Sequence, residues 1–376
     1  MKNNRLPQGI KEYTTEEAVK REELTQKLFT VLKKEGYMRA EPAFVDFAKN
    51  LEMERNSSDT LFRSFDSDGK LLAFAGDITP SIIRYIEGDI LPKRVYFDRM
   101  AYSFMPNARS ARVADMCGAQ VYGITGAEGD AEIIAAAYDS LVFAGIKDVK
   151  ITISHGFFIK SVIYSYKPTE DITAEDIKVL VETGRCGKLN EVCVAAVNAL
   201  AKQKGDIKIM QEAAEGINNK EAIDCLLRLF EIHRILAEYG LADAVEFDFG
   251  YMSDTSYYNG MIFKLTKDGS VLAEGGHFTG IKNSGNATGC AFKYELNNII
   301  KVLEAIVPAD DKKILMGISS GDEALAKARK IKISLMESDV RVDTVYNVTK
   351  AECKNAAVLR NIENYIYIND KGEIEE

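Results

Sequence analysis

The sequence predicts an α+β protein: a strand-rich body interrupted by one long helical block, followed by a small α/β domain. Short apolar runs typical of strands recur between residues 71 and 154 and again between 244 and 273. Residues from about 169 to 240 are charged and carry amphipathic helical repeats, so they are expected to be a helical insertion. Residues 309–376 alternate strand and helix patterns, which indicates a small domain with a largely parallel sheet.

The first element is predicted to be an amphipathic helix. Thr14 and Glu17 have the spacing of a capping box, in which each side chain bonds the backbone of the other residue. Leucines at positions 24, 28 and 32 then recur at helical spacing until Gly36, which is expected to end the helix.

Strands and further helices follow in order along the body. Strands are expected at residues 71–75, 94–97, 119–123 and 150–154, with a polar loop at 106–112. An alanine-rich helix opens at Asp130, with acidic residues at the favourable end of its dipole, and closes at Gly145. A helix from Tyr294 ends before Pro308, so the expected domains are residues 1–308 and 309–376.

Composition excludes several classes of protein. With 376 residues and 46% apolar content, the chain can bury a large core and is expected to hold two domains, with three as the alternative. Its net charge of -9 disfavours a general nucleic-acid binder, and residues 309–376 carry only 11 basic against 13 acidic side chains. No membrane-length apolar run and no signal-peptide pattern occur, so a soluble, cytoplasmic protein is expected.

The cysteines and histidines predict no metal site. Six scattered cysteines form no CxxC pair, and reduced, mostly buried thiols are expected. His155 and His233 have no carboxylate or cysteine at metal-binding spacing. His277 follows two glycines, where it is interpreted as an ordinary loop residue in preference to a catalytic base. Residues 317–321 are interpreted as a strand-to-helix turn, because they lack the lysine of a phosphate-binding loop.

Candidate binding residues lie at a strand end and in a hairpin. Asp77 and Thr79 follow a strand, where a carboxylate and a hydroxyl could bind an ammonium group; a turn-initiating Asp and a helix-capping Thr are the alternative. Tyr257 and Tyr258 precede a strand and a double glycine at 275–276. They are expected to alternate across a strand, so that only one tyrosine faces a pocket while the other packs into the core or an interface.

Several segments, taken in order, resemble the histidyl-tRNA synthetase-like family over essentially the whole chain. Besides the tyrosine hairpin and the double glycine, they are residues 6–12, 36–42, 75–84, 118–132 and 289–292. The resemblance implies the antiparallel sheet of class II aminoacyl-tRNA synthetases, flanked by helices. It also implies a homodimer and a C-terminal domain similar to a reduced anticodon-binding domain.

The resemblance also assigns the candidate pocket. Asp77 and Thr79 correspond to the residues that hold the amino group of histidine, and Tyr257 and Tyr258 to pocket walls. Gln120 stands where the family has a glutamate and Met116 where it has a glutamine. Both replacements weaken histidine recognition, so a degenerate histidine-type pocket is expected.

Three arginines that a working synthetase needs are replaced. Ser103 stands at the arginine that grips the α-phosphate of ATP, and Leu296 at the arginine over the nucleotide. Ser253 stands at the arginine beside the reacting carboxylate. Each cation at such a site contributes orders of magnitude in rate, so amino-acid activation is not expected.

Within this family, retained scaffold without synthetase chemistry is typical of ATP phosphoribosyltransferase regulatory subunits. The resemblance therefore implies a non-catalytic subunit without cofactor or metal. Its partner would be the short-form ATP phosphoribosyltransferase catalytic subunit of histidine biosynthesis, with relay of histidine feedback as a further possibility. Arg109 and Arg112 could contact phosphate or that partner, or be solvated loop residues. The alternatives are a histidyl-tRNA synthetase, and a free-standing pseudoenzyme that binds an amino acid or RNA.

Overall fold

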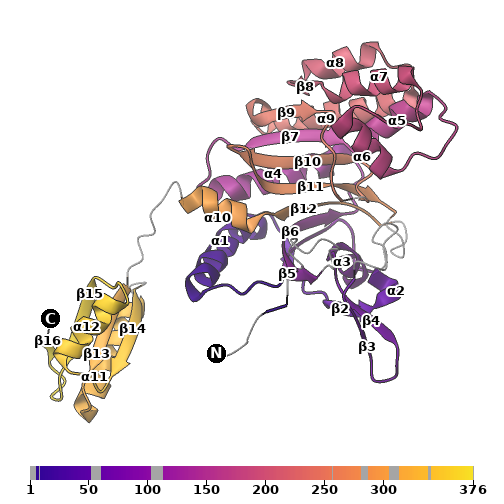
Figure 1. Ribbon diagram of the computed structural model, residues 1–376. Coiled ribbons are helices and arrows are strands. Elements are labelled where there is room, and N and C mark those ends of the chain that lie inside the picture. Colours follow the sequence, from indigo (N-terminus) through magenta and orange to yellow (C-terminus); the bar gives the residue numbers. More distant parts are fainter. Residues whose placement is uncertain are drawn as a thin grey trace. The chain divides into compact units, whose positions relative to one another are not determined.

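The computed structural model describes residues 6–7, 9–51, 61–102, 113–255, 257–280, 287–304, 313–337 and 340–375 (Figure 1). Contacts divide the chain into two compact units, Met1–Ala305 and Ile306–Glu376. In the described part, none of the helices has both the length and the apolar character needed to cross a lipid bilayer.

A mixed sheet organises the first unit. Its strands run in the order β1-β5-β6-β12-β11-β10-β7-β9-β8. Their bounds are β1 (Met38–Arg39), β5 (Lys93–Tyr102), β6 (Val113–Tyr122), β7 (Lys150–His155), β8 (Lys204–Gly205), β9 (Val245–Asp248), β10 (Met261–Lys267), β11 (Ser270–Thr279) and β12 (Thr288–Tyr294). The pairs β1–β5 and β7–β9 are parallel, and the others are antiparallel. The expected antiparallel sheet is thus confirmed for its centre and corrected to a mixed sheet towards its edges.

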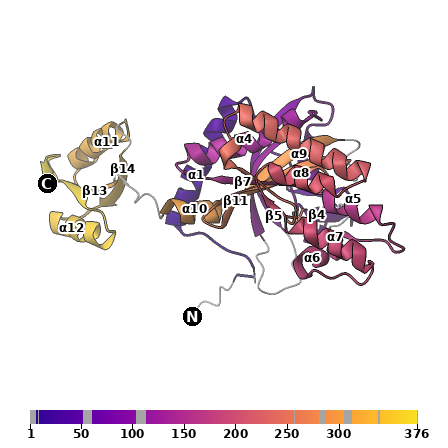
Figure 2. The same cartoon turned by 90° about the horizontal axis from the view of Figure 1, so that it is seen from above.

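The two faces of this sheet are covered by different helices. Helices α1 (Thr15–Lys34), α4 (Ala127–Phe143) and α10 (Leu296–Glu304) contribute to the main hydrophobic core, together with Val121, Cys290 and Phe292 from the strands. The capping box of Thr14 and Glu17 is present at the start of α1. On the other face, α3 (Thr79–Tyr85) packs in a second cluster with Tyr122 and other strand residues. Figure 2 shows α1, α4 and α9 in a view turned by 90° from that of Figure 1.

Apart from the two-residue strand β8, the chain between β7 and β9 is mainly helical, as expected for the insertion. Its helices are α5 (Phe158–Ser165), α6 (Ala174–Thr183), α7 (Glu191–Ala201), α8 (Lys208–Glu215) and α9 (Lys220–Glu238), followed by the 3-10 turn η2 (Ala242–Ala244). Thr173 and Asp176 form a capping box at α6, and Asn219 caps α9 through the backbone nitrogen of Ala222. Their apolar faces join the main core, so the insertion packs as part of the first unit.

Shorter elements complete the first unit. A small sheet of order β2-β4-β3 is made by β2 (Val45–Phe47), β3 (Arg63–Phe65) and β4 (Leu71–Phe74), next to α2 (Ala48–Leu51). The β10–β11 hairpin turns at Asp268 and Gly269, which both have positive φ. That pair of conformations suits the right-handed twist of paired strands, and Asp-Gly adopts it readily.

The second unit is a small α/β domain, as the alternating pattern predicts. Strands β13 (Lys313–Ile318), β14 (Arg341–Tyr346) and β15 (Asn364–Ile368) pair in parallel, and β16 (Ile374–Glu375) adds an antiparallel edge. Helices α11 (Asp322–Glu337) and α12 (Lys350–Leu359) contribute to two separate apolar clusters of this unit. All six cysteines of the chain are free thiols, and five are buried, which confirms the expected thiol state.

Candidate functional site

The structure brings four of the expected pocket residues into one hydrogen-bonded chain. The Tyr257 hydroxyl donates to Asp77 Oδ2 over 2.8 Å. Thr79 Oγ1 lies 3.0 Å from the same tyrosine oxygen, and Gln120 Nε2 donates to Thr79 Oγ1 over 3.0 Å. A fifth residue, Tyr122, donates its hydroxyl to Gln120 Oε1. Residues from α3, β6 and the segment before β10 therefore form one polar network.

The donors of this network point in one direction. Because Tyr257 gives its proton to Asp77 and Gln120 gives an amide proton to Thr79, the threonine hydroxyl is left to donate to Tyr257. Burial and then the charge of Asp77 raise the pKa of Tyr257 and of Tyr122 well above the ordinary value. Both phenols therefore stay protonated, and each donor leads towards the single carboxylate at Asp77.

Both oxygens of Asp77 have a donor within the chain. Oδ2 accepts from Tyr257, and Oδ1 accepts the backbone N–H of Thr79 over 2.7 Å. The second bond is that of a turn-initiating Asp, one of the two expected interpretations. Thr79 is the first residue of α3 rather than its cap, which is Ile78. Its buried hydroxyl serves the network instead of the helix end.

The two tyrosines do not alternate across a strand, so that expectation is wrong. β10 begins only at Met261, and the rings of Tyr257 and Tyr258 both pack against the α3-side cluster, as does Met116. Their centroids are 4.9 Å apart in an edge-on arrangement. A Cβ atom at Gly276 would come within 2.7 Å of Tyr258 Cγ. The glycine thus admits the chain's own aromatic ring, where a ligand was expected.

Two of the three positions at which the resemblance implies a lost arginine lie in the described part of the chain. Ser253 Oγ accepts the backbone N–H of Thr255, and among the described residues it is not hydrogen-bonded to the network. Leu296 is buried in the main core at the start of α10. Within the described ranges, no lysine or arginine donates to Asp77, Thr79 or Gln120. Ser103, Arg109 and Arg112 lie outside the described residues.

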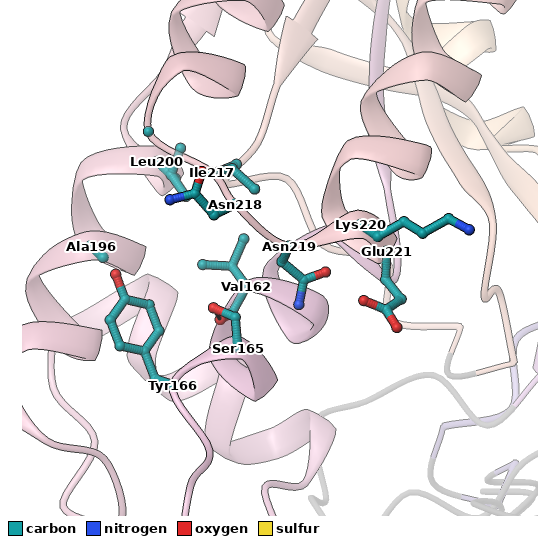
Figure 3. A pocket seen from close by; sticks show the side chains of 11 residues that line it. Val162, Ser165, Tyr166, Ala196, Leu200, Ile217, Asn218, Asn219, Lys220 and Glu221 are labelled. Atoms are coloured by element: carbon teal, nitrogen blue, oxygen red, sulfur yellow. Dashed lines mark hydrogen bonds between the residues drawn. The ribbon is translucent and has the colours of Figure 1, made fainter.

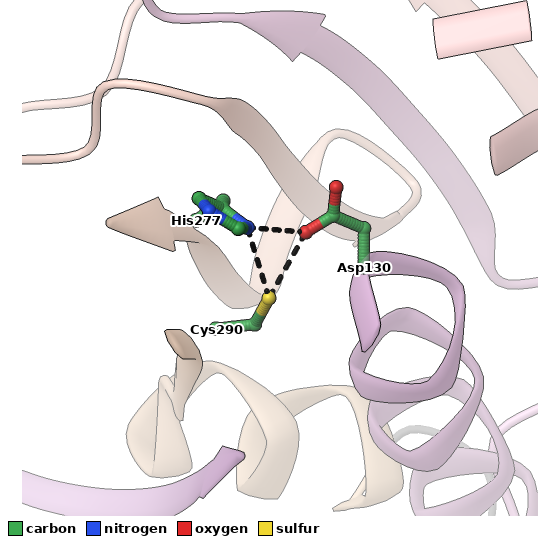
Figure 4. A group of neighbouring side chains, drawn as sticks. All are labelled: Asp130, His277 and Cys290. Atoms are coloured by element: carbon green, nitrogen blue, oxygen red, sulfur yellow. Dashed lines mark hydrogen bonds and ion pairs between the residues drawn. The ribbon is translucent and has the colours of Figure 1, made fainter. Parts of the chain in front are cut away.

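A second polar group lies on the opposite face of the same sheet. His277 on β11 and Cys290 on β12 are a directly opposed cross-strand pair, and Asp130 comes from the first turns of α4. His277 Nδ1 lies 2.8 Å from Asp130 Oδ1, and Cys290 Sγ lies 2.9 Å from the same oxygen (Figure 4). Arg228 on α9 donates to Asp130 Oδ2 over 2.7 Å. Asp130 and Cys290 are buried, and His277 is 8% exposed.

This group corrects the interpretation of His277 as a loop residue. His277 is a strand residue with a buried carboxylate partner. The sequence does not show this partner, because the register between strands decides on which face of the sheet each side chain lies. Burial opposes ionisation of Asp130, but hydrogen bonding from His277 and the charge of Arg228 outweigh it and lower its pKa. Burial and the Asp130 charge raise the pKa of the Cys290 thiol well above its ordinary value.

A cavity of about 490 Å³ lies within the helical insertion, away from both groups (Figure 3). It is bordered by α5, α7 and the start of α9, and its polar lining includes Ser165, Tyr166, Asn218 and Glu221. Asn219, which also lines it, is already engaged in capping α9 and in donating to the Ser161 carbonyl. None of the expected pocket residues lines this cavity.

Comparison with curated proteins relates the whole chain to regulatory subunits. A relative from Thermoanaerobacter pseudethanolicus, named ATP phosphoribosyltransferase regulatory subunit, is 24% identical over 374 residues, covering 92% of this chain and 95% of the relative. A protein of the same name from Clostridium kluyveri is 24% identical and covers 95% and 97% of the two chains.

Solved structures and a family model agree on the fold. An ATP phosphoribosyltransferase regulatory subunit/histidyl-tRNA synthetase from Bacillus halodurans matches with a TM-score of 0.81 at 18% identity, covering 98% of each chain. Histidyl-tRNA synthetase from Nostoc sp. PCC 7120 matches with a TM-score of 0.79 at 16% identity, covering 99% and 96%. The model of the histidyl-tRNA synthetase family matches residues 9–296. This chain therefore belongs to the histidyl-tRNA synthetase family, and it has the class II synthetase-like fold that its sequence predicts.

Proposed function

We propose that this chain is a regulatory subunit of ATP phosphoribosyltransferase, which binds the short catalytic subunit and raises its activity in histidine biosynthesis. The names of the curated relatives support a regulatory role in that pathway. ATP and phosphoribosyl pyrophosphate bind the partner in this proposal, and the partner performs all covalent chemistry. The subunit acts as a homodimer, as the family resemblance implies.

One observation supports the non-catalytic part of the proposal: the expected pocket residues are bonded to one another, and no cation among the described residues joins them. Adenylation places negative charge on phosphorus, and that charge needs cations positioned in advance. The described network around Asp77 instead consists of hydroxyls, one amide and one carboxylate. At the position where a synthetase has an arginine over the nucleotide, Leu296 is committed to the core.

Histidine feedback is relayed through the same pocket in this proposal. The amino group of histidine would displace the Tyr257 hydroxyl from Asp77 Oδ2, because that oxygen is the network's terminal acceptor. An ammonium–carboxylate bond joins two opposite charges, whereas only one partner is charged in the phenol bond that it replaces, so the ammonium bond is the stronger one. Binding would thereby free Tyr257 and break the order of the network.

The first test is formation of phosphoribosyl-ATP by the purified short catalytic subunit, with and without this chain. Stimulation that saturates with added chain is expected, and heat-unfolded chain serves as the control. Absence of stimulation at every ratio would contradict the regulatory role. ATP-pyrophosphate exchange with histidine separates the alternative, a true synthetase: no exchange is expected from this chain, while a working histidyl-tRNA synthetase assayed in parallel shows it.

The feedback proposal is tested by Asp77→Asn in the reconstituted complex. This change removes the anion but keeps an oxygen for the Thr79 backbone, so the turn is preserved. Loss of histidine inhibition is expected in this variant and not in Asp148→Asn, whose side chain is 85% exposed beside Lys267. Equal inhibition of both variants would place histidine elsewhere, with the regulatory role still standing.

A further inference from the structure

The buried group of Asp130, His277 and Cys290 contains three kinds of side chain that bind metal ions. Their ligand atoms are Asp130 Oδ1, His277 Nδ1 and Cys290 Sγ, and all lie within 4.8 Å of one another. The sulfur lies 3.4 Å from the imidazole nitrogen and 2.9 Å from the carboxylate oxygen. Figure 4 shows the three side chains converging on one point from β11, β12 and α4.

The donor set indicates which metal would bind. Imidazole, thiolate and carboxylate together suit zinc and similar divalent transition ions, whereas magnesium and calcium prefer oxygen ligands alone. Catalytic and exchangeable zinc sites have three protein ligands and leave the fourth position to water or another ligand. This group matches that number.

Two of the three ligand side chains, His277 and Asp130, have a second polar atom, and in each case that atom contacts a further residue. His277 Nε2 lies 3.3 Å from Thr279 Oγ1, and Asp130 Oδ2 accepts from Arg228. Such outer contacts fix the orientation of ligand side chains in metal proteins. Gly260 also makes room for the histidine, because a Cβ atom there would come within 2.9 Å of His277 Cβ.

The ligand atoms need only a small adjustment to surround an ion. Bond lengths near 2.0–2.3 Å separate tetrahedral ligand atoms by roughly 3.3–3.6 Å. The sulfur-to-nitrogen separation of 3.4 Å already fits, and the two contacts of Asp130 Oδ1 at 2.8 and 2.9 Å must open by about half an ångström. The side chains of His277 and Arg228 are 10% and 26% exposed, which provides a path from solvent.

A nucleophilic relay does not fit the same geometry. In such a relay, the nucleophile and the carboxylate bond opposite nitrogens of the imidazole. Here both the sulfur and the carboxylate oxygen lie at Nδ1. A thiol that donates to a buried carboxylate is moreover held in its protonated form.

We propose that Asp130, His277 and Cys290 bind one divalent transition metal ion of the zinc class, with water at the fourth position. The sulfur–metal bond forms as the Cys290 thiol releases its proton to solvent. His277 Nδ1 gives up the proton that it shares with Asp130 as the neutral ring changes to the tautomer protonated at Nε2, next to Thr279 Oγ1, and no electron is transferred. The positive charge of Arg228 close to Asp130 weakens the attraction for a cation, so the ion is exchangeable rather than permanently bound.

The test uses the untagged full-length chain, stripped of metal and titrated with Co²⁺ as the spectroscopic probe. A thiolate-to-cobalt charge-transfer band is expected to saturate at one equivalent and to disappear when Zn²⁺ is added. Cys290→Ser should abolish the band, and Cys225→Ser, which alters another buried thiol on α9, should retain it. His277→Gln provides a second ligand variant if Cys290→Ser does not fold, which circular dichroism will show.

Three outcomes would overturn the proposal. One is the absence of a charge-transfer band in the wild-type chain, which needs no variant to interpret. Another is a band of unchanged intensity in folded Cys290→Ser, which would assign the ion to a different thiol. The third is a band lost equally in Cys225→Ser. In the expected case, Zn²⁺ also raises the melting temperature of the wild-type chain and of Cys225→Ser but not that of Cys290→Ser.

Discussion

Replacing Tyr257 by phenylalanine tests the bond that satisfies Asp77 Oδ2. The change removes the hydroxyl that donates to Asp77 Oδ2 over 2.8 Å and accepts from Thr79 Oγ1, and it leaves the aromatic ring in place. A hydrogen bond to a charged group contributes about 1.5–3 kcal/mol net, and one between neutral groups about 1 kcal/mol. Because Asp77 is only partly buried and keeps its bond from the Thr79 backbone, we expect about 1.5 kcal/mol from the bond to Asp77 and about 1 kcal/mol from the bond to Thr79 in the free energy of unfolding.

The same change should strengthen histidine binding under the proposed function. Histidine would no longer compete with a phenol for Asp77, and removal of about 1.5 kcal/mol of competition corresponds to roughly tenfold tighter binding. Calorimetry measures the affinity. Urea unfolding, followed by circular dichroism because the chain has no tryptophan, measures the stability. Tyr239→Phe, at an exposed tyrosine ending α9, is the control for loss of a phenol. Weaker histidine binding by Tyr257→Phe would refute competition and make the phenol a ligand contact instead.

Three further changes test the network, the sheet and a buried histidine. Gln120→Glu replaces the donor to Thr79 with a second buried anion and should lower the free energy of unfolding by about 2–4 kcal/mol at neutral pH. The control Gln26→Glu, at an exposed position, should change it very little. Equal urea midpoints for the two variants would contradict the donor order. Gly118→Ala would place a Cβ atom against a carbonyl of β12, so it should lower the free energy of unfolding by about 3 kcal/mol or yield insoluble protein. In the control Gly187→Ala, which has open space around the position, the free energy of unfolding should change by no more than about 0.5 kcal/mol. Burial lowers the pKa of His155 to about 4; the charge of Asp130 opposes this shift, and the charges of His277 and Arg228 add to it. Between pH 6.5 and 4, His155 therefore takes up a proton only in the unfolded chain. Stability should therefore fall by roughly 1–2 kcal/mol between pH 7 and 5 through this group, and urea titrations of His155→Asn at both pH values should show that much less loss than wild type.

Elements with a strong local pattern could be predicted from the sequence. The α1 helix has a capping box and regular leucines, and the second unit alternates β and α patterns, so both are found where expected. The polar network was predictable only as a set, through Asp77, Thr79, Gln120 and Tyr257, because its members are far apart in the chain. The order of its donors needs coordinates, since it depends on which hydroxyl lies nearest the carboxylate.

The metal-binding candidate could not be found in this way. His277 and Cys290 are thirteen positions apart, and only the β11–β12 register makes them opposite partners. A shift of one residue in that register would turn one of them to the other face of the sheet. Asp130 has the sequence signature of an acidic residue in the first turn of a helix, and nothing local shows that it points into the core. Its burial was the missing information.

A retained fold without the adenylation cations, as proposed for this chain, has one physical explanation. An arginine that serves adenylation stabilises a transition state, and the folded chain gains little from it in the absence of substrate. Leu296 in its place is buried in the main core, where a leucine side chain contributes about 1.5–3 kcal/mol. The bond from Tyr257, which the family resemblance gives as a retained residue, likewise satisfies the Asp77 carboxylate without ligand. Leu296 and this bond both stabilise the scaffold in the absence of substrate, which fits the proposed role of a subunit that acts through a partner.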